Sequence, residues 1–179
     1  FDTAVHDMIK KLLRDHKRII FNGNGYSDAW VEEAERRGLP NIRSMVEAIP
    51  ALTTEKAVKL YESFGVFTKA ELESRAEVEY EAYGKMINIE ARTMIDMASK
   101  QIIPAVIKYT TQLAGSLGAV KAACPEADTS VQAELLTETS ALLSDMKVAL
   151  AALIDITEEA AGVDGAETQA HVYHEKVVP

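Results

Sequence analysis

The chain has 179 residues, 47% of them apolar and only 6% aromatic, and this length suits one domain or one domain with a small appendage. The low aromatic share, together with abundant Ala, Leu, Glu and Lys, favours packed helices over sheets. The net charge of −9 argues against nucleic acid as a partner, because phosphate binding requires a concentrated basic surface.

Cys124 is the only cysteine, so an internal disulfide is impossible and a cytoplasmic location is expected. The sequence implies no base beside this thiol, and we interpret Cys124 as a small packing residue rather than a nucleophile. The longest uninterrupted apolar run covers residues 148–154, far fewer than the roughly 20 residues that cross a bilayer. We therefore predict no membrane segment.

The first predicted element is a helix over residues 2–17, where apolar residues recur at helical spacing. Acidic residues interrupt its basic group, which is expected to form a solvated helix face. That group consists of Lys10, Lys11, Arg14, Lys17 and Arg18. Residues 18–21, Arg-Ile-Ile-Phe, are predicted to form the only strand.

Residues 22–25, Asn-Gly-Asn-Gly, are predicted to end this strand in a tight turn, because Asn-Gly pairs favour positive φ. Ser27 or Asp28 is expected to cap a short helix that extends to Arg37 and ends at Gly38.

Gly23 and Gly25 also form a G-x-G pattern between a strand and a helix, as in some nucleotide-binding loops. The third glycine of the dinucleotide pattern is replaced here by Asp28, and no Gly-Lys-Ser/Thr follows. An acidic residue at the positive end of a helix repels phosphate. We therefore predict a simple turn rather than a phosphate-binding loop.

Two short helices are predicted over residues 44–48 and 53–64. Thr68 and Glu71 then form a capping box, in which each residue's side chain bonds to the other's backbone N–H. This box opens the longest periodic stretch, which continues to about Ala123.

Two residues interrupt that long helix. Gly84 weakens it by roughly 1 kcal/mol relative to Ala, and Pro104 predicts a kink near residues 100–104, because it removes one backbone hydrogen bond. The predicted apolar stripe consists of Leu72, Tyr83, Ile87, Met94, Ala98, Ile102, Val106, Tyr109, Leu113, Leu117 and Val120.

After a turn at residues 125–128, Thr129 and Gln132 are predicted to form a second capping box. The helix that follows alternates apolar spacings of four and three, as coiled coils do, and its face is wide enough to contact two neighbours. That face contains Leu135, Thr139, Leu142, Met146, Ala149, Leu153, Ile156 and Ala160, and is widened by Leu136, Leu143 and Leu150. A last helix begins near Ala166.

The predicted fold is mainly α: an antiparallel bundle of long helices, one of them kinked, with a small N-terminal part that contains one short strand or ribbon. Residues 1–65 are predicted to form a junction subdomain of short helices. Residues 66–179 are predicted to form the long-helix bundle, with the last helix truncated.

The last helix carries Glu167, His171, His174 and Glu175 at spacings of three and four. Di-iron bundles place a Glu-x-x-His motif on each of two helices, and zinc requires three or four converging ligands. Only one imperfect copy is present, so we predict a surface cluster and no metal ligand. A metal-binding bundle with His171 and His174 as ligands stays open as an alternative.

Asp96 and Lys100 stand four residues apart and predict a surface ion pair. Glu90 lies among apolar neighbours and is interpreted as a surface carboxylate. No spacing assembles a nucleophile with a base or a pair of convergent carboxylates. We therefore predict no catalytic and no cofactor-binding residue in this chain.

Three segments resemble the C-terminal region of type III glutamine synthetases. They are RIIFNGNGYSDAWVEEAERRGLPN at residues 18–41, GVFTKAELESR at 65–75 and KMINIEARTMIDMASKQIIPAVIKY at 85–109. The resemblance extends over nearly the whole chain in the same order, and through residues 130–170 it rests on helical pattern and composition.

The resemblance implies a parent enzyme that makes glutamine from glutamate and ammonia with ATP and Mg or Mn. In that family the catalytic residues lie on a β-barrel upstream, and the subunits form stacked hexameric rings. This chain is then expected to be a non-catalytic structural domain without a cofactor of its own. Its expected partners are the upstream barrel and other subunits.

The turn after residue 21 is the expected docking site. Its residues are Phe21, Asn22, Gly23, Asn24, Gly25, Tyr26 and Trp30. An alternative hypothesis is a free-standing helical interaction module that uses the Leu-rich face of residues 135–160.

Overall fold

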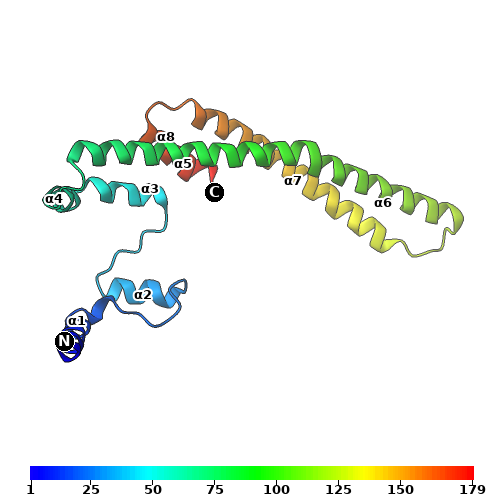
Figure 1. Ribbon diagram of the computed structural model, residues 1–179. Coiled ribbons are helices and arrows are strands. Elements are labelled where there is room, and N and C mark those ends of the chain that lie inside the picture. Colours follow the sequence, from blue (N-terminus) through cyan, green and yellow to red (C-terminus); the bar gives the residue numbers. More distant parts are fainter. The chain divides into compact units, whose positions relative to one another are not determined.

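The computed structural model describes residues 1–179, and the chain consists of helices joined by turns and loops, without a β-strand (Figure 1). It divides into two compact units, residues 1–47 and 48–179. The predicted division lies at residue 65, whereas the observed units divide at residue 47, because the 3-10 segment Ile49–Thr53 packs against the long helix α5 (Lys69–Met97). Independent folding of residues 66–179 stays a prediction.

The first unit contains helix α1 (Asp2–Asp15), the 3-10 turn η1 (Lys17–Ile19) and helix α2 (Asp28–Arg36), and helix α3 (Met45–Ala48) begins at its end. Helix α1 buries no residue, and Ala34 is the buried residue of α2. Gly38 has a φ of +69°, which confirms it as the residue that ends the second helix.

The predicted strand at residues 18–21 is wrong. Residues 17–19 form the η1 turn, and Ile20 is extended but has no strand beside it. The guanidinium of Arg37 donates to the carbonyl oxygens of Arg18, at 3.1 Å, and of Ile20. A side chain therefore takes the place that a neighbouring strand would fill.

The turn at residues 22–27 also differs from the expected Asn-Gly turn, because neither Gly23 nor Gly25 has a positive φ. Asn24 organises it instead: its Oδ1 accepts from the Tyr26 N–H at 3.0 Å, and its carbonyl accepts from the Ser27 hydroxyl at 2.7 Å. This is the local hydrogen bonding by which Asn side chains stabilise turns.

The second unit begins with the 3-10 segment η2 (Ile49–Thr53) and helix α4 (Glu55–Ser63), whose N-cap Thr54 accepts from the Ala57 N–H at 3.3 Å. The capping box before α5 is confirmed. The Thr68 N–H donates to the Glu71 carboxylate at 2.7 Å, and the Glu71 N–H donates to the Thr68 hydroxyl at 3.4 Å.

The long helix is continuous from α5 through a π-helical turn, η3 (Ala98–Ile102), into α6 (Ile103–Ala123). Figure 1 shows its axis changing direction where α6 begins, as Pro104 predicts. A π-turn widens the spacing between inward residues from four to five, so Ala98 is followed on the inner face by Ile103. Ile102, Tyr109 and Met94 are exposed and do not belong to the buried stripe that was predicted.

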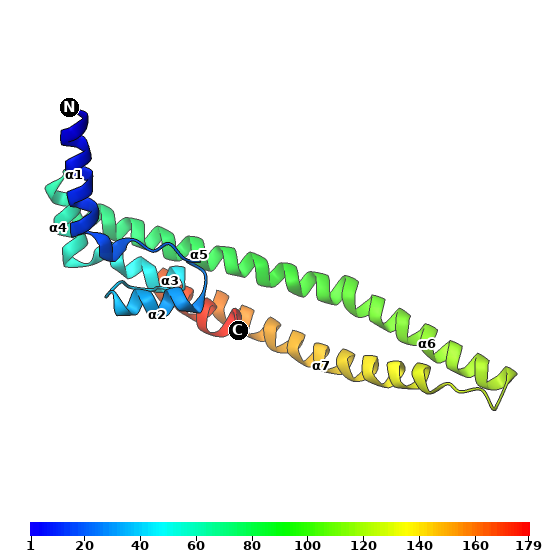
Figure 2. The same cartoon turned by 90° about the horizontal axis from the view of Figure 1, so that it is seen from below.

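Helix α7 (Ser130–Ala161) runs antiparallel to the long helix and packs against α5 and α6 (Figures 1 and 2). The predicted capping box at its start is wrong. Thr129 is buried and makes no cap hydrogen bond, and the Asp128 carboxylate accepts from the Ser130 N–H at 2.9 Å instead. The wide Leu-rich face is only partly used, since Leu135 and Leu142 are exposed.

Helix α8 (Ala166–Val172) and the π-turn η4 (Tyr173–Val177) fold back between α5 and α7 and close the core. That core consists of Ala91, Ala160, Tyr173 and Val177. The predicted antiparallel arrangement of long helices is confirmed, and its best-packed region is the three-helix junction of α5, α7 and α8.

Candidate functional site

The turn predicted to dock is built around two aromatic rings in contact, tilted by 41° to each other. The Phe21 and Trp30 ring centroids lie 4.6 Å apart, and the Arg37 guanidinium carbon lies 5.9 Å from the Phe21 centroid. A Cβ added at Gly23 would lie 2.4 Å from the Phe21 Cζ, so the absence of a side chain there allows the Phe21 ring its position. The structure thus brings the two ends of the predicted site together.

The other residues of this predicted site lie on the surface. Asn22, Asn24 and Gly25 are exposed, and Tyr26 is fully exposed at the tip of the turn. A fully exposed tyrosine offers a large apolar face with a polar end, which is the kind of side chain that interfaces favour. A docking role for these residues stays a prediction.

A basic pocket lies beside this turn. Its walls come from the η1 turn and the end of α2, and it has a volume of about 480 Å³. The lining residues are Lys17, Arg18, Arg36 and Arg37. An adjoining pocket of about 570 Å³ shares Lys17 and Arg37 and adds Arg14.

Glu33 is the carboxylate that pairs with this cluster. Its side chain accepts from Arg36 Nε at 2.7 Å and from Arg37 Nε. These hydrogen bonds to Arg36 and Arg37 lower the pKa of Glu33 to about 2, so the carboxylate is charged at neutral pH. Glu33 holds the two arginines at the end of α2.

The convergence of these basic residues did not follow from the sequence, in which Lys17 and Arg18 lie nearly twenty positions before Arg36 and Arg37. The group at residues 10–18 is predicted as a solvated face, and residues 18–21 as a strand, which would have kept the guanidinium of Arg37 away from the backbone. The Arg-Arg pair at the end of the second predicted helix was the available signal.

The cluster on the last helix makes contacts with tyrosines of α5. The Tyr83 hydroxyl lies 3.2 Å from His174 Nδ1, and the Tyr80 hydroxyl donates to Glu167 at 3.5 Å. His171 Nδ1 lies 3.5 Å from Glu175. The structure contains no group of three or more His, Cys, Asp or Glu side chains placed to hold a metal ion. The predicted cluster therefore attaches the last helix to α5.

Gln169 adds to this attachment. Its side-chain amide donates to the carbonyl oxygens of Ala160, at 3.1 Å, and Val163, at 3.3 Å, near the C-terminal end of α7. Lys176 pairs with Glu159 at 2.9 Å. The Gln169 amide thus donates to backbone carbonyl oxygens at a helix end, where acceptors lack intrahelical partners.

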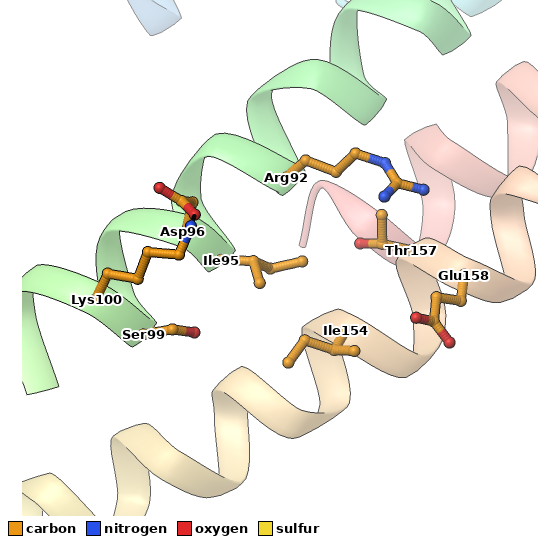
Figure 3. Close-up of a pocket in the computed structure, with 8 residues that line it drawn as sticks. All are labelled: Arg92, Ile95, Asp96, Ser99, Lys100, Ile154, Thr157 and Glu158. Carbon is orange, nitrogen blue, oxygen red and sulfur yellow. Dashed lines mark ion pairs between the residues drawn. The ribbon is translucent and has the colours of Figure 1, made fainter.

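A pocket of about 300 Å³ lies between α5 and α7 at the π-turn (Figure 3). Arg92 and Thr157 face each other across it, and the apolar side chains of Ile95 and Ile154 lie between the two helices (Figure 3). The predicted ion pair of Asp96 with Lys100 is confirmed at its edge. Arg92 Nε donates to the Asn88 amide oxygen at 3.0 Å, so this guanidinium is also hydrogen-bonded within α5.

Cys124 is exposed at the end of α6 and is not the packing residue that was predicted. Glu90 is exposed, as expected. No helix is both long and apolar enough to cross a membrane.

Comparison with known proteins identifies relatives of this chain. Residues 4–121 match the family model described as the glutamine synthetase C-terminal domain. A type-3 glutamine synthetase of Dictyostelium discoideum is 39% identical over 118 residues, which are 66% of this chain and 16% of that protein.

Two bacterial relatives align with almost the whole chain. A glutamine synthetase of Butyrivibrio fibrisolvens is 33% identical over 97% of the chain, and one of Bacteroides fragilis is 31% identical over 99%. The chain spans 25% of the length of each of these relatives. The family match extends over well more than half of the chain, from α1 through nearly all of α6, and the chain belongs to the glutamine synthetase C-terminal domain family.

Proposed function

We propose that this chain is the structural and assembly domain of a type III glutamine synthetase and performs no chemistry by itself. In the complete cytoplasmic enzyme, ATP, glutamate, ammonia and Mg or Mn bind to another part of the polypeptide, where glutamate and ammonia are ligated to glutamine. The family match and the span of a quarter of the bacterial relatives' length support this assignment.

The observation that carries the proposal is the apolar surface of the hairpin formed by α6 and α7. Helix α6 has no buried residue, although its sequence is largely apolar. Exposed side chains along the hairpin include Ile107, Tyr109, Val131, Leu135, Leu142 and Val148. A group of exposed apolar side chains along one hairpin suits a contact with another protein surface, and a homo-oligomer supplies one.

The role of this surface is tested in the complete enzyme with two matched double variants. Leu135→Glu with Leu142→Glu places two charges on the apolar face, and we expect smaller assemblies in analytical ultracentrifugation. Thr137→Glu with Ser144→Glu adds the same charge at the same seven-residue spacing, on exposed polar positions of α7, and leaves assembly unchanged. Equal effects of the two variants would contradict an assembly role for the apolar face.

The absence of chemistry is tested by supplying the 179-residue chain with ATP, glutamate, ammonia and magnesium. We expect no glutamine, whereas the complete enzyme assayed in parallel forms it. Turnover by the purified chain that persists after a second independent purification would refute the proposal.

The docking part of the proposal concerns the turn that ends at Tyr26. We expect Tyr26→Ala to weaken the attachment of this turn to the catalytic part of the complete enzyme, with Trp30 more accessible to an aqueous fluorescence quencher. Asn41→Ala, at an exposed position of the same unit outside the turn, serves as the control.

The alternative is a free-standing helical interaction module that uses the same Leu-rich face. The exposure of Leu135 and Leu142 favours a partner there in either case. The two candidates differ in the polypeptide that precedes residue 1: the assembly domain requires a catalytic barrel in the same chain, and the free-standing module lacks one.

A further inference from the structure

We propose that the basic pocket between the η1 turn and the end of α2 binds a small, multiply charged phosphate oxoanion, a site separate from the apolar hairpin surface and independent of the function proposed above. The argument rests on four cationic side chains, Lys17, Arg18, Arg36 and Arg37, that line one pocket of about 480 Å³. Oxoanions of this kind are the ligands that such Arg and Lys groups bind best, through charge-assisted hydrogen bonds.

The charge of the cluster is only partly neutralised within the protein. Glu33 pairs with Arg36 and Arg37, and neither Lys17 nor Arg18 makes an ion pair. Arg14, on the wall of the adjoining pocket, has no ion-pair partner either. Five cationic side chains and one carboxylate leave an excess of positive charge. The electric fields of these charges add in the pocket that they line.

One arginine of the pocket is already held in place. Arg37 donates from Nε to Glu33 and from Nη1 to two backbone carbonyl oxygens, so its guanidinium orientation is fixed by four contacts if the Phe21 ring is included. Its Nη2 group makes no hydrogen bond in the structure. A guanidinium fixed by the protein loses less freedom on binding than a mobile one, which strengthens recognition of an anion.

The size of the cluster indicates a small ligand rather than a nucleic acid or a long acidic surface. The first unit contains eight basic and eight acidic residues in residues 1–47, so positive charge is concentrated at the pocket and is not spread over the unit. Nucleic-acid binding requires an extended basic surface. A phosphate or pyrophosphate group needs only a few converging donors.

The first unit contains a fluorescent side chain that can report binding in this pocket. Trp30 is the only tryptophan of the chain, and its ring packs against Phe21, which the Arg37 guanidinium approaches. Titration of the 179-residue chain with inorganic pyrophosphate at low salt is expected to change Trp30 fluorescence saturably, and calorimetry to give one site per chain. Affinity falls as NaCl is added, because exposed charges are screened within about 10 Å at 0.1 M salt.

Two double variants make the test specific. Lys17→Gln with Arg18→Gln removes two charges from the pocket wall, and we expect an affinity loss of about tenfold or more, the effect of about 1.4 kcal/mol. Lys10→Gln with Lys11→Gln removes the same charge from α1, outside the pocket, and changes affinity less than about twofold. Neither pair makes side-chain hydrogen bonds, so circular dichroism stays that of the unaltered chain.

Several outcomes would overturn the proposal: no saturable binding of pyrophosphate at low salt, an equal loss in both variants, or saturable binding of a poly-glutamate peptide without binding of pyrophosphate. The last result would assign the pocket to an acidic protein segment. ADP titrated in parallel distinguishes the source of the phosphate: equal affinity indicates recognition of the phosphates alone, and tighter binding of ADP indicates that the nucleoside also contacts the protein.

Discussion

Gly84 lies on the face of α5 against which α8 packs, and its lack of a side chain sets how closely the two helices approach. A Cβ added there would lie 3.5 Å from Gln169 Oε1 and 3.5 Å from Tyr173 Cδ2, which is ordinary van der Waals contact. The sequence marks this glycine only as a weak point of a long helix. The structure adds that the space above it is occupied by two side chains that hold α8.

The effect of a substitution at Gly84 on the free energy of unfolding is expected to change sign with the size of the new side chain. Gly84→Ala fits the space and improves helix propensity, so the free energy of unfolding rises by up to roughly 1 kcal/mol. Gly84→Leu overfills the contact with Tyr173 and lowers it by about 1–3 kcal/mol. Urea denaturation of the two variants measures both. Destabilisation by the alanine would show that the helices are closer than the structure has them.

Gly23 has a similar role beside an aromatic ring. We expect Gly23→Ala to displace the Phe21 ring, because the new methyl group would overlap its Cζ. The ring is the far end of a flexible side chain, so the unit stays folded while the contact with Trp30 is lost. The emission maximum of Trp30 then shifts, whereas Gly25→Ala leaves it unchanged, since nothing lies near its added methyl group. An unchanged spectrum in both variants would contradict this account.

At the scale of the element, the start of α5 depends on the pair Thr68 and Glu71. Burial of these residues is slight, so their mutual hydrogen bonds carry most of their effect. Thr68→Ala is expected to lower the free energy of unfolding by about 1 kcal/mol, and Thr68→Ser, which keeps the hydroxyl, by much less. Thermal denaturation followed by circular dichroism measures the difference, and equal losses in the two variants would exclude the cap as the cause.

Elements with strong local signals were predictable, and those that depend on distant partners were not. The helices from Lys69 to Ala123 and from Ser130 to Ala161 follow from apolar periodicity and flanking turn residues. The strand at residues 18–21 looked plausible by composition, but a strand exists only beside another strand, and here the backbone carbonyls bond to Arg37. At the start of α7, two adjacent side chains can accept a hydrogen bond from the helix backbone, and Asp128 does so in place of Thr129.

The same reasoning applies to the candidate sites. The amino-acid sequence of residues 18–41 indicates the family, and the family match over residues 4–121 confirms that prediction. The basic pocket was not predictable, because residues far apart in the sequence form it. They come together only because residues 18–21 form no strand and their carbonyl oxygens bond to Arg37. The spacing of Glu167 and His174 marks them as a cluster on the last helix, but their tyrosine partners lie more than eighty residues earlier in the chain.

At the scale of the whole molecule, three tyrosines make the three-helix junction sensitive to alkali. Burial raises the pKa of Tyr80, Tyr83 and Tyr173, and the negative charges of Glu167 and Glu90 add to this for the first two. A raised pKa in the folded state means that their contribution to stability is complete below the ordinary tyrosine pKa of about 10 and is lost as the pH rises through the folded-state value.

We therefore expect absorbance at 295 nm to show a group of tyrosines that ionise later than free tyrosine, with helix content falling as they do. In Gly84→Leu, where α8 is displaced, the late group moves toward the ordinary range. Ionisation of every tyrosine in a single step near pH 10 would contradict the packing of α8 described above.

The π-turn at Ala98–Ile102 has a further consequence. The turn holds one residue more than an α-helical turn, so each later residue is rotated by about 100° about the helix axis relative to its place in an uninterrupted helix. The number of residues in the turn therefore decides which face of α6 points toward α7. Deletion of Gln101 is expected to return the turn to α-helical pitch and to keep Ile103 on the inner face, because Ile103 then follows Ala98 by four residues of α-helix. Deletion of two residues from this turn exceeds the one additional residue that it holds, and is expected to rotate α6 by about 100° and present a different face of it to α7, while the three-helix junction stays intact.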